Sequence, residues 1–167
     1  MSLAKALFLC IMYRKKRILA ERGIFVNRLK RIIYVLLQCT WGLPTTLIGL
    51  GFFLANRKKH EHTIYRGCID THWNHYGGLS LGLFIFTPKK DAWMSQPIRV
   101  HEYGHTIQSM VLGPLMLFVG IISVTWGNLP YYAKKRKEKK LPYTACFVEW
   151  WASKWGELVT KEKAVWQ

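Results

Sequence analysis

Acidic residues are scarce in this sequence: 9 Asp and Glu stand against 25 Lys and Arg, which gives a formal net charge of +16. An excess of this size indicates attraction to an anionic partner, either a nucleic acid or the lipid headgroups of a membrane surface. Half of the residues are apolar and 14% are aromatic, which disfavours a disordered, low-complexity chain. With 167 residues, we expect one domain rather than two.

Closely spaced cysteines are also missing. Cys10, Cys39, Cys68 and Cys146 are widely scattered, and no two of them form a C-x-x-C pair. The spacing therefore indicates neither a thiolate zinc site nor a disulfide framework. We expect each cysteine to be a small buried side chain.

Charge is absent from two long stretches. The first runs from Ile32 to Asn56 between basic residues, and it is long enough to cross a hydrocarbon core of about 30 Å as a helix. The second runs from Thr106 to Ala133 and has aromatic side chains suited to the headgroup level near its end, at Trp126, Tyr131 and Tyr132. We therefore expect an integral membrane protein, in the cell membrane, and no nucleic-acid partner, because the basic residues flank apolar spans.

The N-terminal stretch MSLAKALFLCIMYRKKR has its apolar part before its basic cluster, unlike a signal peptide, so we expect it to be retained. Residues 13–31 interleave basic and apolar side chains, which favours an amphipathic helix on an anionic membrane face. A solvated charged helix is the alternative. The charged run 134–140 must stay in water or at the headgroups, and we interpret it as a solvated loop.

Two short β-rich stretches, HTIYRGCI and LSLGLFIF, predict a small β-hairpin or meander. The apolar strand from Leu81 to Phe86 could hold an extended peptide by edge pairing. Two helices follow, one that begins near Pro97 and one that covers residues 142–160.

The stretch RVHEYGHTIQS contains the pattern H-E-x-x-H. On a helix, His101 and His105 lie on one face and can bind one metal ion, while Glu102 can reach a water molecule bound to that ion. Zinc requires such nitrogen donors and, for catalysis, three protein ligands with one open position. The alternative is two histidines that share a helix face and are satisfied by hydrogen bonds.

The five residues 101–105 resemble the active helix of zincin metallopeptidases, and Glu149-Trp150-Trp151-Ala152 is similar to the glutamate helix of their gluzincin branch. The resemblance implies zinc held by His101, His105 and Glu149, with Glu102 as general base. Many gluzincins have an acidic residue shortly after the third ligand to orient a histidine, whereas Ser153 and Lys154 follow here.

Glu149 is also singled out by its surroundings, because an isolated carboxylate in an apolar, tryptophan-rich helix needs a cation or metal partner. Its alternatives are a wet helix-bundle interior or an ion pair with Lys154. His72 and His75 could ligate metal, bind substrate or simply belong to a polar loop. For oxyanion or substrate contacts the candidates are His72, His75, Tyr131 and Tyr143, and the sequence does not choose among them.

The third ligand imposes a geometric condition. If residues 106–133 crossed the membrane once as a helix, they would carry the chain about 40 Å, whereas residues 141–149 would return it only about 13 Å. Glu149 would then be too far from His101. We therefore expect a re-entrant or bent segment, broken at Gly113-Pro114 and at Gly120, and a kink in the first run at WGLP, residues 41–44.

These observations predict a mainly α-helical membrane protein with a small β-hairpin or meander, in a single membrane-embedded domain. Its parts are a basic amphipathic lead-in (1–31), an apolar span (32–56), a β-rich region (57–96) and the zinc-site helices (97–167). The predicted function is a membrane-bound zinc metallopeptidase that acts on a peptide or membrane-protein substrate, with anionic lipids as partners. The alternative is a non-enzymatic membrane subunit with a structural zinc site, closed by His72 or His75, and basic faces that dock lipid or a membrane protein partner.

Overall fold

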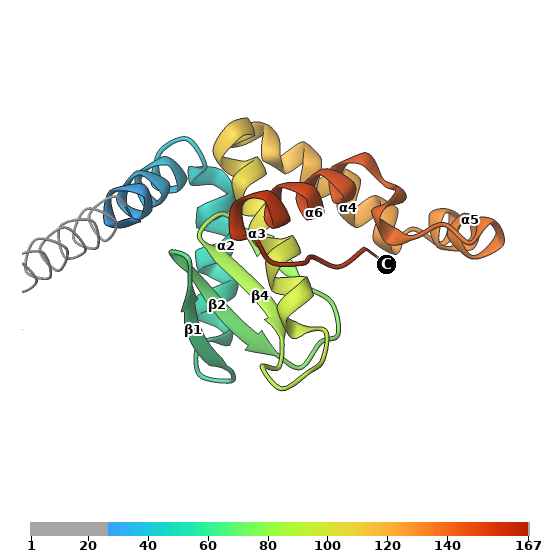
Figure 1. Cartoon of the computed structure of the whole chain (residues 1–167), viewed down its shortest axis with the longest axis horizontal. Helices are drawn as coiled ribbons and strands as arrows, with labels where there is room; N and C mark the ends of the chain where they lie inside the picture. Colours follow the sequence, from blue (N-terminus) through green and yellow to red (C-terminus); the bar gives the residue numbers. More distant parts are fainter. Residues whose placement is uncertain (1–26, 167) are drawn as a thin grey trace, which may run out of the picture. The chain divides into compact units, whose positions relative to one another are not determined.

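The computed structural model describes residues 27–166 (Figure 1). The chain divides into two compact units, Met1–Tyr34 and Val35–Gln167. In the first unit, residues 27–34 are helical. Most of the expected amphipathic lead-in over residues 1–31, together with Cys10, lies outside the described residues.

The second unit is mainly helical and contains one small sheet, as the sequence predicts. Its elements are α2 (Leu43–Asn56), β1 (Glu61–Tyr65), β2 (Cys68–Trp73), β3 (Leu79–Leu81), β4 (Phe84–Pro88), α3 (Ser95–Leu112), η1 (Gly113–Leu115), α4 (Met116–Asn128), α5 (Pro130–Lys139), η2 (Tyr143–Ala145) and α6 (Phe147–Thr160). The run 134–140 is not the expected loop, because Lys, Arg and Glu are good helix formers and Pro130 suits a first helical turn.

The sheet is mixed, with strand order β1-β2-β4-β3, and is therefore more than a hairpin or meander. Each of the two predicted β-rich stretches, HTIYRGCI and LSLGLFIF, contains a turn and therefore belongs to two strands, β1 and β2 for the first and β3 and β4 for the second. Arg66 and Gly67, both with positive φ, join β1 to β2, and Gly82 with φ 61° lies between β3 and β4. The central pair β2–β4 is parallel. Residues 81–86 are thus not one edge strand: β4 is an interior strand, and β3 is the edge.

Helix α3 packs against the strands β3 and β4 and against α6, which crosses it in Figure 1. The α3–α6 contact is very close: an added Cβ at Gly104 would lie 1.9 Å from the carbonyl oxygen of Ala152, and one at Gly156 would lie 2.2 Å from that of Val100. The buried residues of α6 recur at helical spacing and so form one face, at Val148, Glu149, Ala152, Ser153, Gly156 and Thr160. That face is what places Glu149 beside α3.

A buried ion pair fixes α3 to the sheet. Arg99 Nε lies 2.7 Å from Oδ2 of Asp70, which is on β2 and completely buried. The Thr87 hydroxyl on β4 donates to the other oxygen of Asp70 at 2.7 Å. Arg99 is two residues before His101, so this pair sets where the H-E-x-x-H turn begins relative to the sheet.

The second uncharged run is broken as expected at Gly113-Pro114, where η1 separates α3 from α4. It is not broken at Gly120, which lies inside α4. Residues Ser95–Asn128 are long and apolar enough to cross a membrane, but the first part of this stretch is packed inside the protein. The first run is kinked, with a bend of 92° between the helices Asn27–Cys39 and Leu43–Asn56.

Two smaller expectations need correction. The last helix begins at Phe147 rather than Pro142, because Cys146 has an extended backbone that separates η2 from α6. Of the cysteines, Cys68 is buried as predicted and Cys146 is partly buried, whereas Cys39 is exposed.

Candidate metal centre

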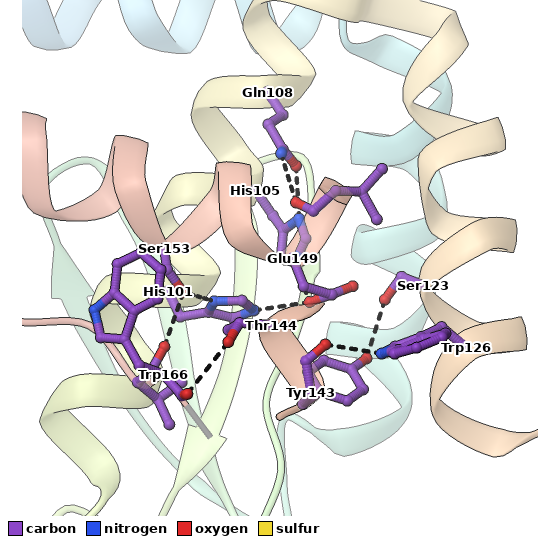
Figure 2. Close-up of polar contacts among 12 residues, drawn as sticks. His101, His105, Gln108, Ser123, Trp126, Tyr143, Thr144, Glu149, Ser153 and Trp166 are labelled. Carbon is purple, nitrogen blue, oxygen red and sulfur yellow. Dashed lines mark hydrogen bonds and ion pairs between the residues drawn. The ribbon is translucent and has the colours of Figure 1, made fainter. Parts of the chain in front are cut away.

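Three buried side chains from two helices converge on one point (Figure 2). His101 Nε2 lies 3.1 Å from Glu149 Oε2, and His105 Nε2 lies 3.3 Å from the same oxygen. The two histidines are one turn apart on α3, and Glu149 lies in the first turn of α6. The structure thus brings together the three predicted ligands, whose ligand atoms all lie within 4.8 Å of one another.

The Ser153 hydroxyl orients His101. Ser153 Oγ donates to the carbonyl oxygen of Val165 at 2.8 Å and also lies 2.8 Å from His101 Nδ1. Because the hydroxyl has only one hydrogen, it accepts from His101, whose Nδ1 therefore carries a proton. In the neutral imidazole this leaves the lone pair on Nε2, directed at the Glu149 carboxylate.

Gln108 orients His105 in the same way. Its amide nitrogen donates to the carbonyl oxygen of Val148 at 2.9 Å, so its amide oxygen faces His105 Nδ1, at 2.7 Å. An amide oxygen only accepts, and His105 Nδ1 is therefore the protonated nitrogen. In their neutral forms, both histidines therefore present an Nε2 lone pair to the same point.

These contacts leave three acceptors facing each other. A proton on one imidazole can bridge only part of the group, whereas a divalent cation satisfies all three atoms. Ligands held at 2.0 to 2.1 Å around a tetrahedral ion are about 3.3 to 3.4 Å apart, close to the separations of 3.1 and 3.3 Å. Among residues 27–166, Glu149 Oε1 has no hydrogen-bond partner although it is buried. The donor set and its spacing fit a metal ion.

The charge of Glu149 is also consistent with a metal site. Burial alone would raise the pKa of its carboxyl, but hydrogen bonds and charge from His101 and His105 hold the pKa below its usual range. The side chain is therefore a carboxylate that is almost completely inaccessible to solvent. A buried carboxylate needs a positive counterpart. The imidazoles provide it when they are protonated, and a bound cation would provide it when they are neutral.

Glu102 lies at the same site, between the two histidines in sequence and buried. Its carboxylate packs against Gly78: a Cβ added there would lie 2.2 Å from Glu102 Oε1. A cavity of about 1000 Å³ opens on these groups and is lined by His101, Glu102, His105 and Glu149. The edge strand β3 and most of α4 form further parts of its wall.

Tyr143 also lines this cavity. Its hydroxyl lies 3.3 Å from Ser123 Oγ, and its carbonyl oxygen accepts from Trp126 Nε1 at 2.8 Å, which fixes η2 to α4 (Figure 2). Burial, together with the charge of Glu149, raises the pKa of Tyr143 to about 12. The phenol therefore keeps its proton and is a hydrogen-bond donor at neutral pH.

The other three candidate contacts lie away from the cavity lining. His72 is buried in the sheet, where its ring nitrogens lie 3.0 Å from the Thr63 hydroxyl and 3.3 Å from the Thr87 hydroxyl. The ring of His75 packs on Trp73, with centroids 4.9 Å apart. Tyr131 is exposed on α5. Of the four possible oxyanion contacts, the structure brings only Tyr143 to the cavity.

Sequence reasoning missed the positioning roles of Ser153, Gln108 and Gly78. Helical spacing could have found two of them, because Gln108 follows His105 by one turn and Ser153 follows Glu149 by one turn. The pairing of Arg99 with Asp70 has no such local signal, since it depends on how α3 crosses the sheet.

Comparison with protein-family models, curated proteins and solved structures finds no match to this chain. Its function is therefore inferred from the geometry of the site.

Proposed function

We propose that this protein is a membrane-bound zinc metallopeptidase that hydrolyses peptide bonds at or near the bilayer surface. One observation carries the proposal: three mutually facing ligand atoms, with Glu102 beside them, line a large open cavity. A catalytic zinc site requires three protein ligands and one open position. The described residues supply three ligands and a cavity through which water or substrate could reach the fourth coordination position of the metal.

Each residue has a distinct task in this proposal. Zinc would acidify its bound water and polarise the scissile carbonyl. Glu102 takes the proton of the attacking water and gives it to the leaving amine. Tyr143, which stays protonated, is the donor best placed to stabilise the developing oxyanion. Ser153 and Gln108 keep both imidazoles in the tautomer that binds metal.

The substrate is held as an extended peptide. Strand β3 has β4 on one side only, and its residues line the cavity that contains Glu102. The free edge of such a strand offers backbone groups to a peptide by strand addition. The edge that we assign to this role is therefore Leu79–Leu81, not residues 81–86.

A membrane location is supported by the outer surfaces of α2 and α4. Soluble monomers rarely expose apolar patches of more than a few hundred Å². Here both helices expose large apolar side chains, and a basic segment follows each one, at residues 57–59 and 134–140. The exposed side chains outside the cavity lining are Leu43, Leu47, Ile48, Leu50, Phe52 and Leu54 on α2, and Phe118 and Ile122 on α4.

The alternative function, a membrane subunit with a structural zinc, requires a closed site with four ligands. His72 and His75, the candidates for the fourth ligand, do not line the cavity that contains the cluster. Within residues 27–166, the metal-binding group consists of His101, His105 and Glu149. We therefore favour the enzyme.

The first experiment is to purify the protein in mild detergent without added metal and to measure its zinc content. We expect about one zinc ion per chain, lost in His105→Ala and Glu149→Ala. His75→Ala is the matched control and should keep the metal. A Glu149→Ala protein that holds zinc as tightly as the unchanged chain would remove Glu149 from the ligand set.

Catalysis is tested separately by Glu102→Gln. We expect peptide hydrolysis to fall by at least about 100-fold, because the general base is lost, while zinc stays bound. Activity that survives this substitution would end the general-base assignment.

Gly78 allows the position of Glu102 to be tested without changing it. In Gly78→Ala the new Cβ displaces the Glu102 carboxylate, so kcat should fall while zinc content is kept. Gly77→Ala is the matched control, because a Cβ at Gly77 meets nothing within 4 Å. Equal kcat in the two variants would show that the contact with Gly78 does not position Glu102.

A further inference from the structure

Among the described residues that line the cavity, Arg136 on α5 is the single lysine or arginine, and its guanidinium carries a fixed positive charge. The other charged groups in the lining are Glu102 and Glu149, at the metal centre. The remaining basic residues of α5, at Lys134, Lys135, Lys137 and Lys139, are outside the lining.

The guanidinium of Arg136 is held in place at the cavity wall. It donates to the carbonyl oxygens of Trp126 and Gly127, at the end of α4. Its Cζ lies 5.3 Å from the centroid of the Trp126 ring and 5.6 Å from that of Tyr143. Gly127 and Tyr143 also line the cavity, so the charged end of Arg136, and not only its aliphatic stem, belongs to this wall.

Within residues 27–166, no carboxylate forms an ion pair with Arg136, whereas Lys134 on the same helix pairs with Glu138. A guanidinium has five N–H groups, and the two carbonyl oxygens leave several of them for another acceptor. Capping the negative end of α4 explains the two contacts with carbonyl oxygens. It does not explain why the remaining N–H groups of the guanidinium lie at the wall of the cavity that contains the candidate metal centre.

We propose that Arg136 is a specificity-determining residue that binds a carboxylate of the peptide substrate in this cavity. The planar guanidinium matches a carboxylate with paired hydrogen bonds, and this partly buried setting strengthens them. The carboxylate comes either from an Asp or Glu side chain or from the C-terminus of the peptide. This inference rests on the proposed peptidase function and adds the class of substrate to it.

The test uses four peptides of equal length and otherwise identical sequence, with the full-length protein in detergent. One has an acidic side chain and an amidated C-terminus, one a neutral side chain and a free C-terminus, one is neutral with an amidated C-terminus, and one is basic with an amidated C-terminus. We expect one of the first two to exceed the neutral peptide by at least about tenfold in kcat/KM, mainly through KM. Which of the two is preferred identifies the source of the carboxylate.

Arg136→Gln should abolish this preference, and Lys137→Gln should keep it, since Lys137 is one residue away, loses the same charge and does not line the cavity. Arg136→Glu should reverse the preference towards the basic peptide. The zinc content of each variant verifies that it is folded. If Arg136→Gln and Arg136→Glu lose zinc, Arg136→Lys replaces them in the test. We expect Arg136→Lys to keep a preference for the peptide with the carboxylate that is smaller than that of the unchanged protein. Equal kcat/KM for all four peptides with the unchanged protein would overturn the inference, as would a preference that Arg136→Gln retains.

The two proposals fail in different ways. Peptide binding is measured on the Glu102→Gln protein, because this measurement does not depend on turnover. Carboxylate preference in binding without hydrolysis by the unchanged protein would overturn the peptidase and leave the Arg136 site. Hydrolysis of all four peptides at equal kcat/KM would leave the peptidase and overturn the Arg136 site.

Discussion

The two walls of the cavity are built in opposite ways. On one side, α3 and α6 approach so closely that glycines are required at their contact, and the polar side chains buried there are held by specific partners. On the other side, α4 has only two buried residues and α5 has none. The first wall therefore fixes the candidate metal ligands through packing, while the second has few buried side chains and tolerates substitution.

This contrast predicts where substitutions are costly. Protein interiors at close packing cannot absorb an added atom without a shift of backbone. An exposed helix surface has no such limit, and substitutions there usually change stability by less than about 0.5 kcal/mol. Two pairs of variants compare the walls and two further pairs compare neighbouring positions within one wall, from the largest expected effect to the smallest.

The largest effect is expected at the ion pair that holds α3 on the sheet. Arg99→Gln removes the guanidinium from the buried Asp70 carboxylate, which costs about 3 to 5 kcal/mol of unfolding free energy. The measurement is chemical denaturation in detergent. The control is Lys134→Gln on α5, whose ion pair with Glu138 is exposed and is worth at most about 1 kcal/mol. Equal losses in the two variants would contradict the contrast between the walls.

The next effect is at the helix contact. Gly104→Ala brings its Cβ against the backbone of Ala152 and must push α6 away, at a cost of about 1 to 3 kcal/mol. Zinc affinity should fall with it, because Glu149 moves with α6. Gly120→Ala in α4 meets nothing within 4 Å and should stabilise the helix slightly. Unchanged zinc binding in Gly104→Ala would show that the close contact does not place Glu149.

A smaller effect is expected when a ligand is left in place but loses its orienting partner. Ser153→Ala removes the acceptor for His101 Nδ1 and should lower zinc affinity by about 10- to 100-fold. The measurement is competition with a chelator of known affinity. Lys154→Ala is the neighbouring control, because Lys154 is exposed. Restored affinity in Ser153→Thr would identify the hydroxyl as the orienting group.

The sequence predicted more of this site than of the sheet around it. His101, Glu102 and His105 are adjacent on one helix, so their geometry follows from helical spacing alone. Glu149 is predicted on other grounds: the resemblance to gluzincins implies it as a ligand, and a lone carboxylate in an apolar helix needs a cation. The break at Gly113-Pro114 provides the turn that this position requires. These are local properties that a single sequence can express.

The strand pairing could not be read in the same way. Arg66-Gly67 and Gly82 are turn signals inside the two predicted strands, and their meaning depends on which strands become neighbours. The parallel pair β2–β4 and the Arg99–Asp70 ion pair join residues distant in sequence, without a local pattern that specifies them. The charge of the basic run 134–140 predicts only that it stays out of the apolar core, whereas its Lys, Arg and Glu residues also have high helix propensity, and α5 covers it up to Lys139.

The smallest effect separates the two faces of α4 itself. Phe118 and Val119 are neighbours, but Phe118 is exposed whereas Val119 packs with Met116 and Val148. Phe118→Ala should therefore change the unfolding free energy in detergent by less than about 0.5 kcal/mol, although it removes the larger side chain. Val119→Ala should cost about 1 kcal/mol, because Val119 packs with Met116 and Val148 but also borders the open cavity. A larger loss for Phe118→Ala would mean that protein, and not lipid or detergent, covers the outer face of α4.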